Sequence, residues 1–340
     1  MNKNNVIQVF FEKQLVGQLT MHGHNTAFEY DEDWLNNGFP ISPFSLPLEK
    51  QIFVHSKPYF GGLFGVFADS LPDAWGRLLL DRMLKKYKKN PDDVTVLDRL
   101  AIIGDSGMGA LRYHPKISFP EEYFTDNLDE LELYRLGGTS GGARPKIMTK
   151  IDGEPWIIKF PAHVDGKNAG KMEYDYAVCA KECQIAMSDF KLFHSDSCPG
   201  YFGTKRFDRV RDTNGMKRVH MLTAAAILEL DFQQPSLDYH SLMKLTKILT
   251  RNNSFDIENL YRRMCFNVYA HNRDDHSKNF SYLYDSSTDS WRLSPAYDLT
   301  FSSTYYGEHT TTIDGNGRNP GKEELIRVGT MAGLSKSVCS

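Results

Sequence analysis

The sequence predicts an α+β protein with a β-rich module at its N-terminus and a mostly α-helical C-terminal region, and three observations indicate this. The first sixty residues form short runs of alternating character separated by turn residues, which is typical of strands. Most segments after residue 208 carry apolar residues at helical spacing. With 340 residues, the chain exceeds the size that one core usually serves. We therefore expect three regions, 1–118, 119–207 and 208–340, and two lobes or more.

The strands of the N-terminal module are expected at "VIQVFF" (6–11), "QLVGQL" (14–19) and "TAFEY" (26–30), each bounded by turn residues. A helical pair should follow this sheet. Its first helix lies within 69–89, where four apolar residues share a helical stripe: Trp75, Leu78, Leu79 and Met83.

The second helix of the pair lies within 91–104, where Asp92 is the expected N-terminal cap and Gly104 the residue that ends it. "GDSGMGALRYHP" (104–115) then leads into a new region. There, 144–150 and 154–160 form a hairpin around the turn Asp152-Gly153.

A helix is expected over 171–187, with one apolar stripe of Tyr176, Cys179, Ala180, Cys183 and Met187. The chain has five cysteines, an odd number without a CxxC pair, which argues against a disulfide framework. We interpret Cys179 and Cys183 as small core residues, with a metal pair as the alternative.

Three helical segments are expected in the C-terminal region, at 220–230, 239–250 and 256–270. One hairpin follows, with strands at "NFSYLY" and "WRLSPAY" around "DSSTD". The tail from 323 begins a helix and stops soon afterwards.

Charge and hydropathy argue against direct binding to nucleic acid and against a membrane protein. A formal net charge of -3 and a pI near 6.4 give no global field that would attract nucleic acid or an acidic membrane, so any nucleic-acid role should be indirect. No apolar run approaches the roughly 18 residues of a membrane helix, and the amino terminus has no long apolar core. We expect a soluble, cytoplasmic protein without membrane partners.

A glycine-rich stretch, "LGGTSGGARPK" (136–146), precedes the predicted hairpin. Such a loop lets backbone N–H groups approach phosphate oxygens, although glycine-rich turns before hairpins are also common. Lys159 lies near the end of the apolar "WIIKF", where a phosphate or carboxylate partner would offset the cost of burying its charge. The alternative is that Lys159 lies on an edge strand and its ammonium group reaches solvent. Glu173 in the following helix is a possible partner, or a solvated residue of the first turn.

Asp274 and Asn279 have the spacing Asp-x-x-x-x-Asn in "HNRDDHSKNF" (271–280), and Asp298 follows after a hairpin. Phosphoryl transfer needs a carboxylate that accepts the proton of the attacking hydroxyl, and hard oxygen ligands for Mg²⁺. The alternative is a polar loop with helix caps, in which His276 is structural. These features follow the order found in protein kinases: glycine loop, strand lysine, helix glutamate, Asp-x4-Asn and a later aspartate. This order predicts a protein-kinase-like two-lobed fold.

The motifs together resemble those of HipA-family serine/threonine kinases, the toxin halves of bacterial toxin-antitoxin pairs. The resemblance rests on "LVGQLT", "GDSGMGALRY", "GGARPK", "WIIKF", "KRFDR", "RDDHSKNFS" and "LSPAYDL", and it covers nearly the whole chain. It departs from eukaryotic kinases because His276 replaces a lysine two residues after the catalytic aspartate, and because the metal aspartate lies in "AYDL".

The resemblance implies ATP and Mg²⁺ as cofactors, with Asp274 as proton acceptor and with Asn279 and Asp298 as metal ligands. It places the ATP-binding small lobe at 119–207 and the catalytic lobe at 208–340. The residues it implies for ATP are Gly141, Gly142, Ala143, Arg144, Pro145, Lys146, Lys159, Lys205, Arg206, Phe207, His276, Lys278, Asn279, Tyr297 and Asp298. It also implies autophosphorylation at Thr139 or Ser140; both hydroxyls could instead cap the turn.

The partners that the resemblance implies are a HipB-like helix-turn-helix antitoxin, DNA only through that antitoxin, and a protein substrate of the translation machinery such as an aminoacyl-tRNA synthetase. Lys205 stands where family members often have an acidic residue, and the C-terminal end is shorter than the family leads us to expect. Two other classes are a small-molecule phosphotransferase of kinase-like fold and a non-catalytic protein that binds the antitoxin. The second would usually have lost one of Lys159, Asp274, Asn279 or Asp298.

Overall fold

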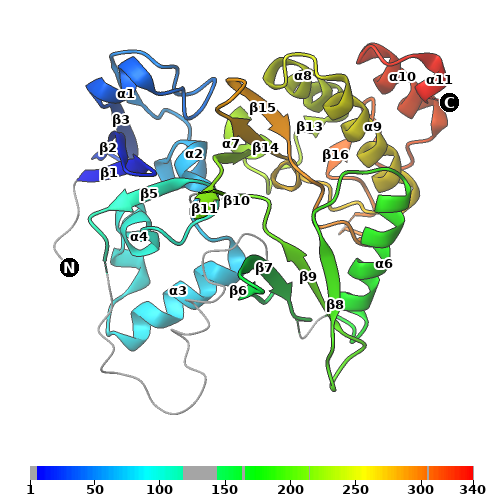
Figure 1. The fold of residues 1–340 in the computed structure, drawn as a ribbon, viewed down its shortest axis with the longest axis horizontal. Coiled ribbons are helices and arrows are strands. Elements are labelled where there is room, and N and C mark those ends of the chain that lie inside the picture. The colour runs from blue at the N-terminus through cyan, green and yellow to red at the C-terminus, as the bar shows by residue number, and fades with distance from the viewer. Residues whose placement is uncertain (1–5, 118–143, 163–164, 214, 305, 340) are drawn as a thin grey trace. The chain divides into compact units, whose positions relative to one another are not determined.

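The computed structural model describes residues 6–117, 144–162, 165–213, 215–304 and 306–339, and the chain divides into two compact units (Figure 1). Met1–Ala162, Asp208–Leu222 and Ala226–Glu229 make up the first unit. His163–Phe207, Thr223–Ala225 and Leu230–Ser340 make up the second. The regional boundaries expected from the sequence, after residues 118 and 207, stay a prediction.

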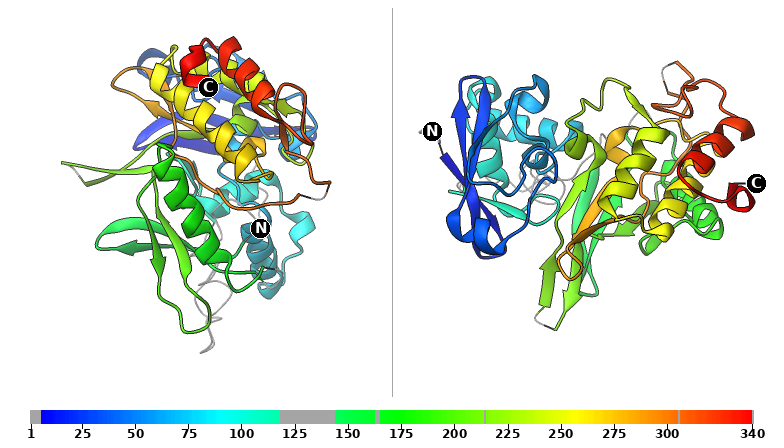
Figure 2. Two further views of the ribbon diagram at one scale, coloured as in Figure 1. Left: turned by 90° about the vertical axis from the view of Figure 1, so that its right-hand side faces the viewer. Right: turned by 90° about the horizontal axis from the view of Figure 1, so that it is seen from above.

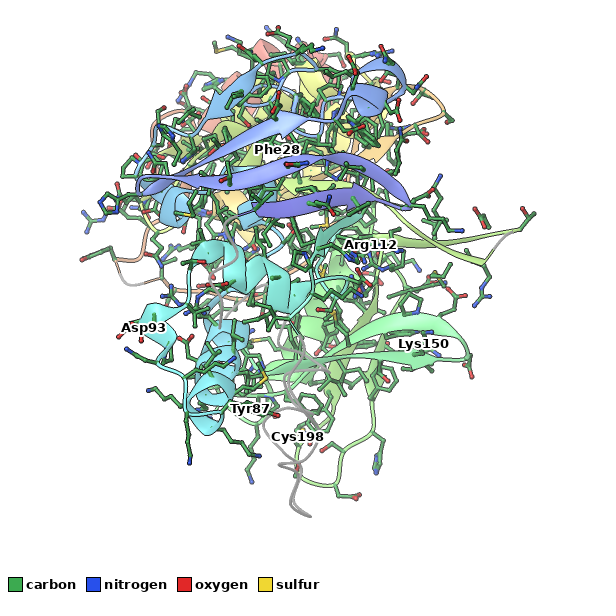
Figure 3. The ribbon with its side chains drawn as sticks, turned by 90° about the vertical axis from the view of Figure 1, so that its left-hand side faces the viewer. Phe28, Tyr87, Asp93, Arg112, Lys150 and Cys198 are labelled. Atoms are coloured by element: carbon green, nitrogen blue, oxygen red, sulfur yellow. The ribbon has the colours of Figure 1, made fainter. Side chains whose placement is uncertain are left out.

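A five-stranded antiparallel sheet begins the first unit, in the order β4-β3-β2-β1-β5. Its strands are β1 Val6–Phe11, β2 Gln14–His22, β3 Asn25–Tyr30, β4 Ile52–Val54 and β5 Leu111–His114. Alternate side chains such as those of Ile7, Val9 and Phe28 are fully buried on one face, and Figure 3 labels Phe28 on this sheet. The three strands expected here are confirmed, because the alternation of the sequence matches the two faces of the sheet.

The stretch 104–115, which the sequence analysis placed in the region 1–118, contains a strand that was not predicted. Its strand β5 returns to pair with β1, because Leu111 and Tyr113 alternate with polar residues and are buried with the N-terminal core. The hydroxyl of Tyr113 lies 2.7 Å from that of Ser70.

Apart from β4, the regular elements between β3 and β5 are helices: α1 Glu32–Asn37, η1 Tyr59–Gly62, α2 Gly65–Ala68, α3 Ala74–Lys86, η2 Pro91–Asp93 and α4 Val96–Ile103. Gly104 ends α4 with a φ of 53°, as expected. The expected cap is wrong, because Asp92 lies inside η2. Thr95 caps α4 instead, in a reciprocal pair with Asp98 whose two bonds measure 3.1 Å.

The expected apolar stripe of α3 is confirmed except at Leu78: Leu79 and Met83 are buried and Trp75 packs against them. Leu80 and Leu84 are buried with Leu79 and Met83, whereas Leu78 is 43% exposed. The helix turns this face towards Val94 and Ile102, which pack against the same cluster.

Two hairpins complete the first unit. β6 Lys146–Ile151 and β7 Glu154–Lys159 pair around Asp152 and Gly153, whose φ angles of 53° and 77° are those of a type I′ turn. This confirms the expected hairpin. β10 Arg209–Asp212 and β11 Gly215–Arg218 form the other.

The second unit contains α6 Ala169–Glu182 and a hairpin of β8 Phe190–Phe193 with β9 Tyr201–Lys205. The helix ends earlier than expected, and Cys179 and Cys183 are exposed rather than part of the core. The other three residues of the expected stripe, Tyr176, Ala180 and Met187, do lie in or against the core, so the stripe is confirmed in part.

The remaining elements of the chain are β12 Met221–Thr223, α7 Ala224–Leu228, β13 Leu237–Asp238, α8 Tyr239–Leu249, α9 Ser254–Tyr269, η4 Ser277–Asn279, β14 Ser281–Asp285, β15 Ser290–Leu293, β16 Thr311–Thr312, α10 Lys322–Met331 and α11 Lys336–Cys339. α8 and α9 confirm two of the three expected helices, while the third, at 220–230, shortens to α7. The hairpin of β14 and β15 is also confirmed. Helices α8, α9 and α10 lie side by side (Figure 2).

One apolar cluster of the second unit joins α6 and α9 to the segment after β15. Ala180, Ile185, Phe266, Ala296 and Leu299 form it, with Tyr176 and Met187 packed against it. Because Ala296 and Leu299 flank Asp298, this core fixes the backbone on both sides of the expected metal ligand. Within the described ranges, no helix is long and apolar enough to cross a membrane.

Candidate active site

The polar stretch 271–280 forms a closed loop between α9 and β14. The side-chain amide of Asn279 donates a hydrogen bond of 2.7 Å to the backbone carbonyl of Asp274. The backbone N–H of Asn279 also donates to the carbonyl of His276, at 2.8 Å. The structure thus brings together the two residues that define the Asp-x4-Asn spacing.

The carboxylate of Asp274 points mainly into solvent. Its side chain is 59% exposed, and the ring of His276 lies beside it, with Nε2 3.9 Å from Oδ1. A carboxylate held on a fixed backbone and open to solvent can receive a hydrogen bond from an incoming hydroxyl.

Asp275, the next residue, is fully buried. Its carboxylate lies 3.0 Å from Nδ1 of His309 and accepts from the hydroxyl of Tyr239 at 3.1 Å and from the N–H of Thr311 at 3.1 Å. The hydroxyl of Thr311 donates to the backbone carbonyl of the same residue. Burial raises the pKa of the Asp275 carboxyl, although these hydrogen bonds oppose the rise.

Two buried asparagines extend this network. Asn267 on α9 donates to the hydroxyl of Tyr239 at 2.9 Å, and Asn272 donates to the Asn267 carbonyl oxygen at 3.0 Å. The loop that carries Asp274 is therefore anchored to α8 and α9 by side chains that sequence analysis did not single out. The sign of this network in the sequence was the second aspartate of "RDDH", Asp275, but its partners lie far from it in the chain.

Asp298 has a φ of 53°, a left-handed conformation that is uncommon for a residue other than glycine. Backbone strain of this kind is often found at functional sites. It follows Tyr297, whose hydroxyl donates to the carbonyl of Lys278 at 2.6 Å and lies 2.5 Å from the hydroxyl of Ser281. The segment with the expected metal aspartate is thus tied to the turn that carries Lys278 and Asn279.

Aromatic rings border this turn. The ring of Phe207 lies 5.6 Å from that of Tyr297, so two residues expected at the nucleotide are in contact. Phe232, which the sequence analysis missed, lies 5.4 Å from the ring of His276 and 4.8 Å from Nζ of Lys278. A cation held over an aromatic face keeps a defined position.

The other expected hinge residues lie at the end of β9. The backbone N–H of Lys205 donates to the carbonyl of Asp189 at 2.8 Å, and Arg206 is 9% exposed. Their contact with adenine stays a prediction.

In the first unit, Lys146 and Lys159 are directly opposite each other on the β6–β7 hairpin. The N–H of Phe160 donates to the carbonyl of Pro145 at 2.8 Å, so the lysine pair beside it is of the narrow, non-hydrogen-bonded kind. Side chains opposite each other point to the same face, which brings two expected phosphate-binding lysines together.

The loop before this hairpin is only partly covered by the structure. Arg144 and Pro145 precede β6. The other expected loop residues, Thr139, Ser140, Gly141, Gly142 and Ala143, lie outside the described residues. Glu173 on α6 is buried, with 3% exposure, and its pairing with Lys159 stays a prediction.

The oxygens of Asn279 and Asp298 fit Mg²⁺ if phosphate oxygens complete its coordination. Asn279 commits its N–H₂ group to Asp274, which orients its oxygen away from that bond. This oxygen and the Asp298 carboxylate are the hard ligands that Mg²⁺ prefers. No cluster of three or more His, Cys, Asp or Glu side chains suited to a metal occurs in the described part of the chain.

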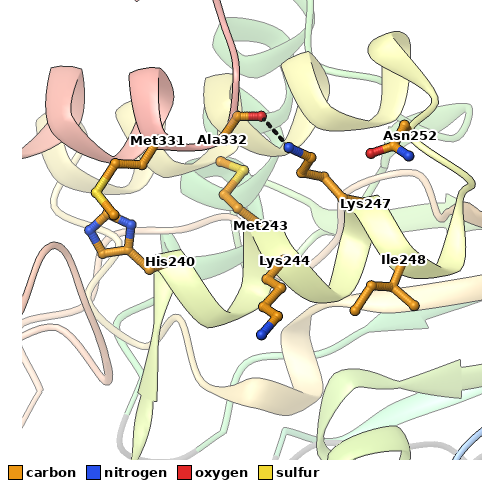
Figure 4. A pocket seen from close by; sticks show the side chains of 8 residues that line it. All are labelled: His240, Met243, Lys244, Lys247, Ile248, Asn252, Met331 and Ala332. Atoms are coloured by element: carbon orange, nitrogen blue, oxygen red, sulfur yellow. Dashed lines mark hydrogen bonds between the residues drawn. The ribbon is translucent and has the colours of Figure 1, made fainter.

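A pocket of about 450 Å³ lies beside α8 and α10 (Figure 4). His240, Met243, Lys244, Lys247, Ile248, Asn252, Met331 and Ala332 line it. Nζ of Lys247 donates to the carbonyl of Ala332 at 3.0 Å, where a cation stabilises the C-terminal end of α10. None of the expected site residues lines this pocket.

Comparison with known proteins identifies the family of the chain. Two curated relatives from Sinorhizobium fredii are similar to it: the protein named "Putative kinase Y4mE" is 28% identical over 88% of this chain and 78% of its own length, and "Putative kinase Y4dM" is 26% identical over 62% and 54%. The HipA of a Shewanella oneidensis complex of HipA, HipB and operator DNA matches with a TM-score of 0.74 at 17% identity, over 98% of this chain and 86% of that one.

This structural likeness confirms the predicted α+β fold class. The family description "HipA N-terminal domain" matches residues 7–114, and "HipA-like C-terminal domain" matches residues 138–339. The two matches contain the β-rich module and all the expected catalytic residues, which confirms the resemblance seen in the sequence. The chain belongs to the HipA family.

Proposed function

We propose that this protein is an ATP-dependent serine/threonine kinase that acts as the toxin of a toxin-antitoxin pair. The observation that carries the proposal is the bond between the Asn279 amide and the Asp274 carbonyl, which joins the two residues of the Asp-x4-Asn spacing while the Asp274 carboxylate stays exposed. The curated relatives named as kinases support the same reaction class.

ATP would supply the phosphoryl group, and Mg²⁺ would neutralise part of its charge. Asp274 orients the hydroxyl of the substrate and takes its proton as the oxygen attacks. Asn279 and Asp298 would hold Mg²⁺. Lys146, Lys159 and Lys278 place positive charge against phosphate oxygens, with the Lys278 side chain steadied by Phe232.

The substrate and partners belong to the same proposal. The substrate is a protein hydroxyl, on a component of the translation machinery such as an aminoacyl-tRNA synthetase. The similar Shewanella structure is titled as a complex of HipA, HipB and operator DNA. A HipB-type helix-turn-helix antitoxin would hold this chain and contact the DNA. Thr139 and Ser140 would accept phosphate in an autophosphorylation that lowers ATP affinity, because the added charge repels ATP.

The test is transfer from labelled ATP to proteins of a cell lysate, with phosphate mapping of the kinase itself. Asp274→Asn keeps the shape and removes the base, so transfer should fall by about two orders of magnitude. Asp289→Asn changes an aspartate that is 70% exposed on the β14–β15 hairpin and should leave transfer unchanged. Unaltered transfer by Asp274→Asn would refute the proposal. Labelling of sugars or aminoglycosides in place of protein would indicate a small-molecule phosphotransferase.

A further inference from the structure

Two cysteines at the C-terminal end of α6 present their side chains to solvent. Cys179 lies in the last turn of the helix, Cys183 caps it, and both are exposed. Exposure of two neighbouring cysteines is uncommon, because cysteine is among the residues most often buried. The sequence left open whether this pair packs in the core or binds a metal, and the exposure of both side chains removes the first alternative.

The backbone holds the two residues one helical turn apart. The N–H of Cys183 donates to the carbonyl of Cys179 at 2.9 Å, the bond that is typical of an α-helix. Residues four apart on a helix lie on the same face, with Cβ atoms about 5–6 Å from each other. The Cys183 thiol is in hydrogen-bond contact with the thiol of Cys179, so the two sulfurs are neighbours.

This spacing suits a bridging ion better than a disulfide. A disulfide needs Cβ atoms about 3.5–4.5 Å apart, closer than one helical turn brings them. A bond between a thiolate and a metal such as zinc is about 2.3 Å long, so two sulfurs on opposite sides of one ion lie about 4.6 Å apart. Side chains at helical spacing reach that separation while the turn stays intact.

The protonation of the thiols points the same way. Desolvation of the sulfur, and then the neighbouring Cys179, raise the pKa of the Cys183 thiol. A thiol that stays protonated at neutral pH reacts slowly with peroxides, because the thiolate is the nucleophile. A soft metal ion displaces the proton as it binds the sulfur.

We propose that Cys179 and Cys183 bind one soft, monovalent metal ion of the Cu(I) class. Each thiol releases its proton to solvent, and each thiolate forms one bond to the ion, which is then two-coordinate. The copper enters and remains as Cu(I), so neither the metal nor the sulfurs change oxidation state. Thiolates are the ligands that select this ion in proteins. The proposal does not depend on the proposed kinase function.

The bound ion would hold a turn that supports the candidate active site. The N–H of Ile185 donates to the carbonyl of Ala180 at 3.0 Å, which closes the end of α6 just beyond Cys183. The side chain of Ile185 belongs to the apolar cluster that contains Ala296. Ala296 lies two residues before Asp298, the expected metal ligand of the kinase site. An ion that fixes the last turn of α6 therefore stabilises the packing beneath Asp298.

Binding is tested with the reduced, full-length protein under anaerobic conditions, by titration with Cu(I) against the chelator bicinchoninate. The protein should retain one equivalent of Cu(I) per chain. Cys179→Ser and Cys183→Ser should each weaken this binding by about 100-fold or more, because a single thiolate remains. Cys198→Ser removes a half-buried thiol from the same compact unit and should leave the affinity unchanged.

A second pair of cysteines is the rival site. Cys265 and Cys339 both lie beside Tyr261, although Cys339 is buried. Binding that is lost in Cys265→Ser and survives in Cys179→Ser overturns the assignment. Complete transfer of Cu(I) from the wild-type protein to the chelator overturns it as well.

Hydrogen exchange measured by mass spectrometry tests the effect on the helix end. With Cu(I) bound, the peptide that covers residues 180–187 should exchange about tenfold more slowly, because the ion opposes local opening of the turn. This protection should be absent from Cys179→Ser and from Cys183→Ser. Unchanged exchange in wild-type protein that retains Cu(I) would overturn the stabilising role of the ion.

Discussion

Asp274 and Asp275 are adjacent in the chain and lie in opposite environments. Asp274→Ala removes a carboxylate that is 59% exposed, so the free energy of unfolding should change by less than about 0.5 kcal/mol while transfer is lost. Asp275→Ala leaves Tyr239, His309 and Thr311 without their shared acceptor and should lower the free energy of unfolding by about 3 kcal/mol. Urea denaturation of both variants measures the difference. Equal losses of stability would contradict it.

His220 gives the first unit a predicted sensitivity to acid. The ring is buried, Nε2 lies 2.8 Å from the carbonyl oxygen of Ile41, and burial lowers its pKa from 6.5 to about 4. The unfolded chain therefore binds a proton at a higher pH than the folded one. Stability should be constant above pH 6.5, fall as pH drops from 6.5 towards 4, and level off below, a loss of about 3 kcal/mol.

The comparison that checks this is wild type against His220→Gln, which keeps a donor and cannot titrate. Chemical denaturation across that pH window should show the extra loss only in the wild type. Parallel curves for the two proteins would show that another group is responsible.

Single residues show where sequence reasoning reached its limit. The spacing of Asp274 and Asn279 was enough to predict a phosphoryl-transfer loop, because both lie in one short turn and their bond is local. Asp275 was not recognised, because its partners His309 and Thr311 lie 34 and 36 residues further along the chain. A buried role that depends on such distant partners leaves no periodic signal in the sequence.

At the scale of elements, the β6–β7 hairpin allows a matched test of phosphate binding. Lys159 faces Lys146 across the hairpin, whereas Lys150 is exposed near the turn (Figure 3). Lys159→Gln should weaken ATP binding by about tenfold or more, the loss of one hydrogen bond to a charged group. Lys150→Gln removes the same charge from the same hairpin and should have little effect. Titration with a fluorescent ATP analogue measures both, and equal affinities for the two variants would argue against the role of Lys159.

Elements with one strong local signal were predicted well, whereas the buried faces of the helices were predicted less well. The turn residues Asp152 and Gly153 allow the left-handed backbone that a tight hairpin needs, so the hairpin was readable from the sequence. The stripes of α3 and α6 were predicted only in part, because Leu78, Cys179 and Cys183 are exposed. Which face is buried depends on neighbours such as Ile102, which packs against α3.

At the scale of the whole molecule, the expected phosphate lysines and the expected catalytic aspartates belong to different compact units. Lys146 and Lys159 lie in the first unit, while Asp274, Asn279 and Asp298 lie in the second. Their order along the chain was sufficient to suggest the family, because motif order survives when spacing changes. Order says nothing of how two units are placed, so the pairing of Lys159 with Glu173 stays a prediction.

The charge of the whole chain leads to the last prediction, which concerns DNA. With a formal net charge of -3, the chain lacks the positive field that gives proteins their sequence-independent affinity for phosphate backbones. Purified alone, it should bind operator DNA weakly, and that binding should disappear as salt is raised from 50 to 200 mM, a range over which such contacts lose several orders of magnitude. Addition of a HipB-type antitoxin should produce a tight, sequence-specific complex that contains both proteins. Fluorescence anisotropy with operator and scrambled DNA, each at both salt concentrations, separates the cases: tight, sequence-specific binding by this chain alone would show that it reads DNA directly.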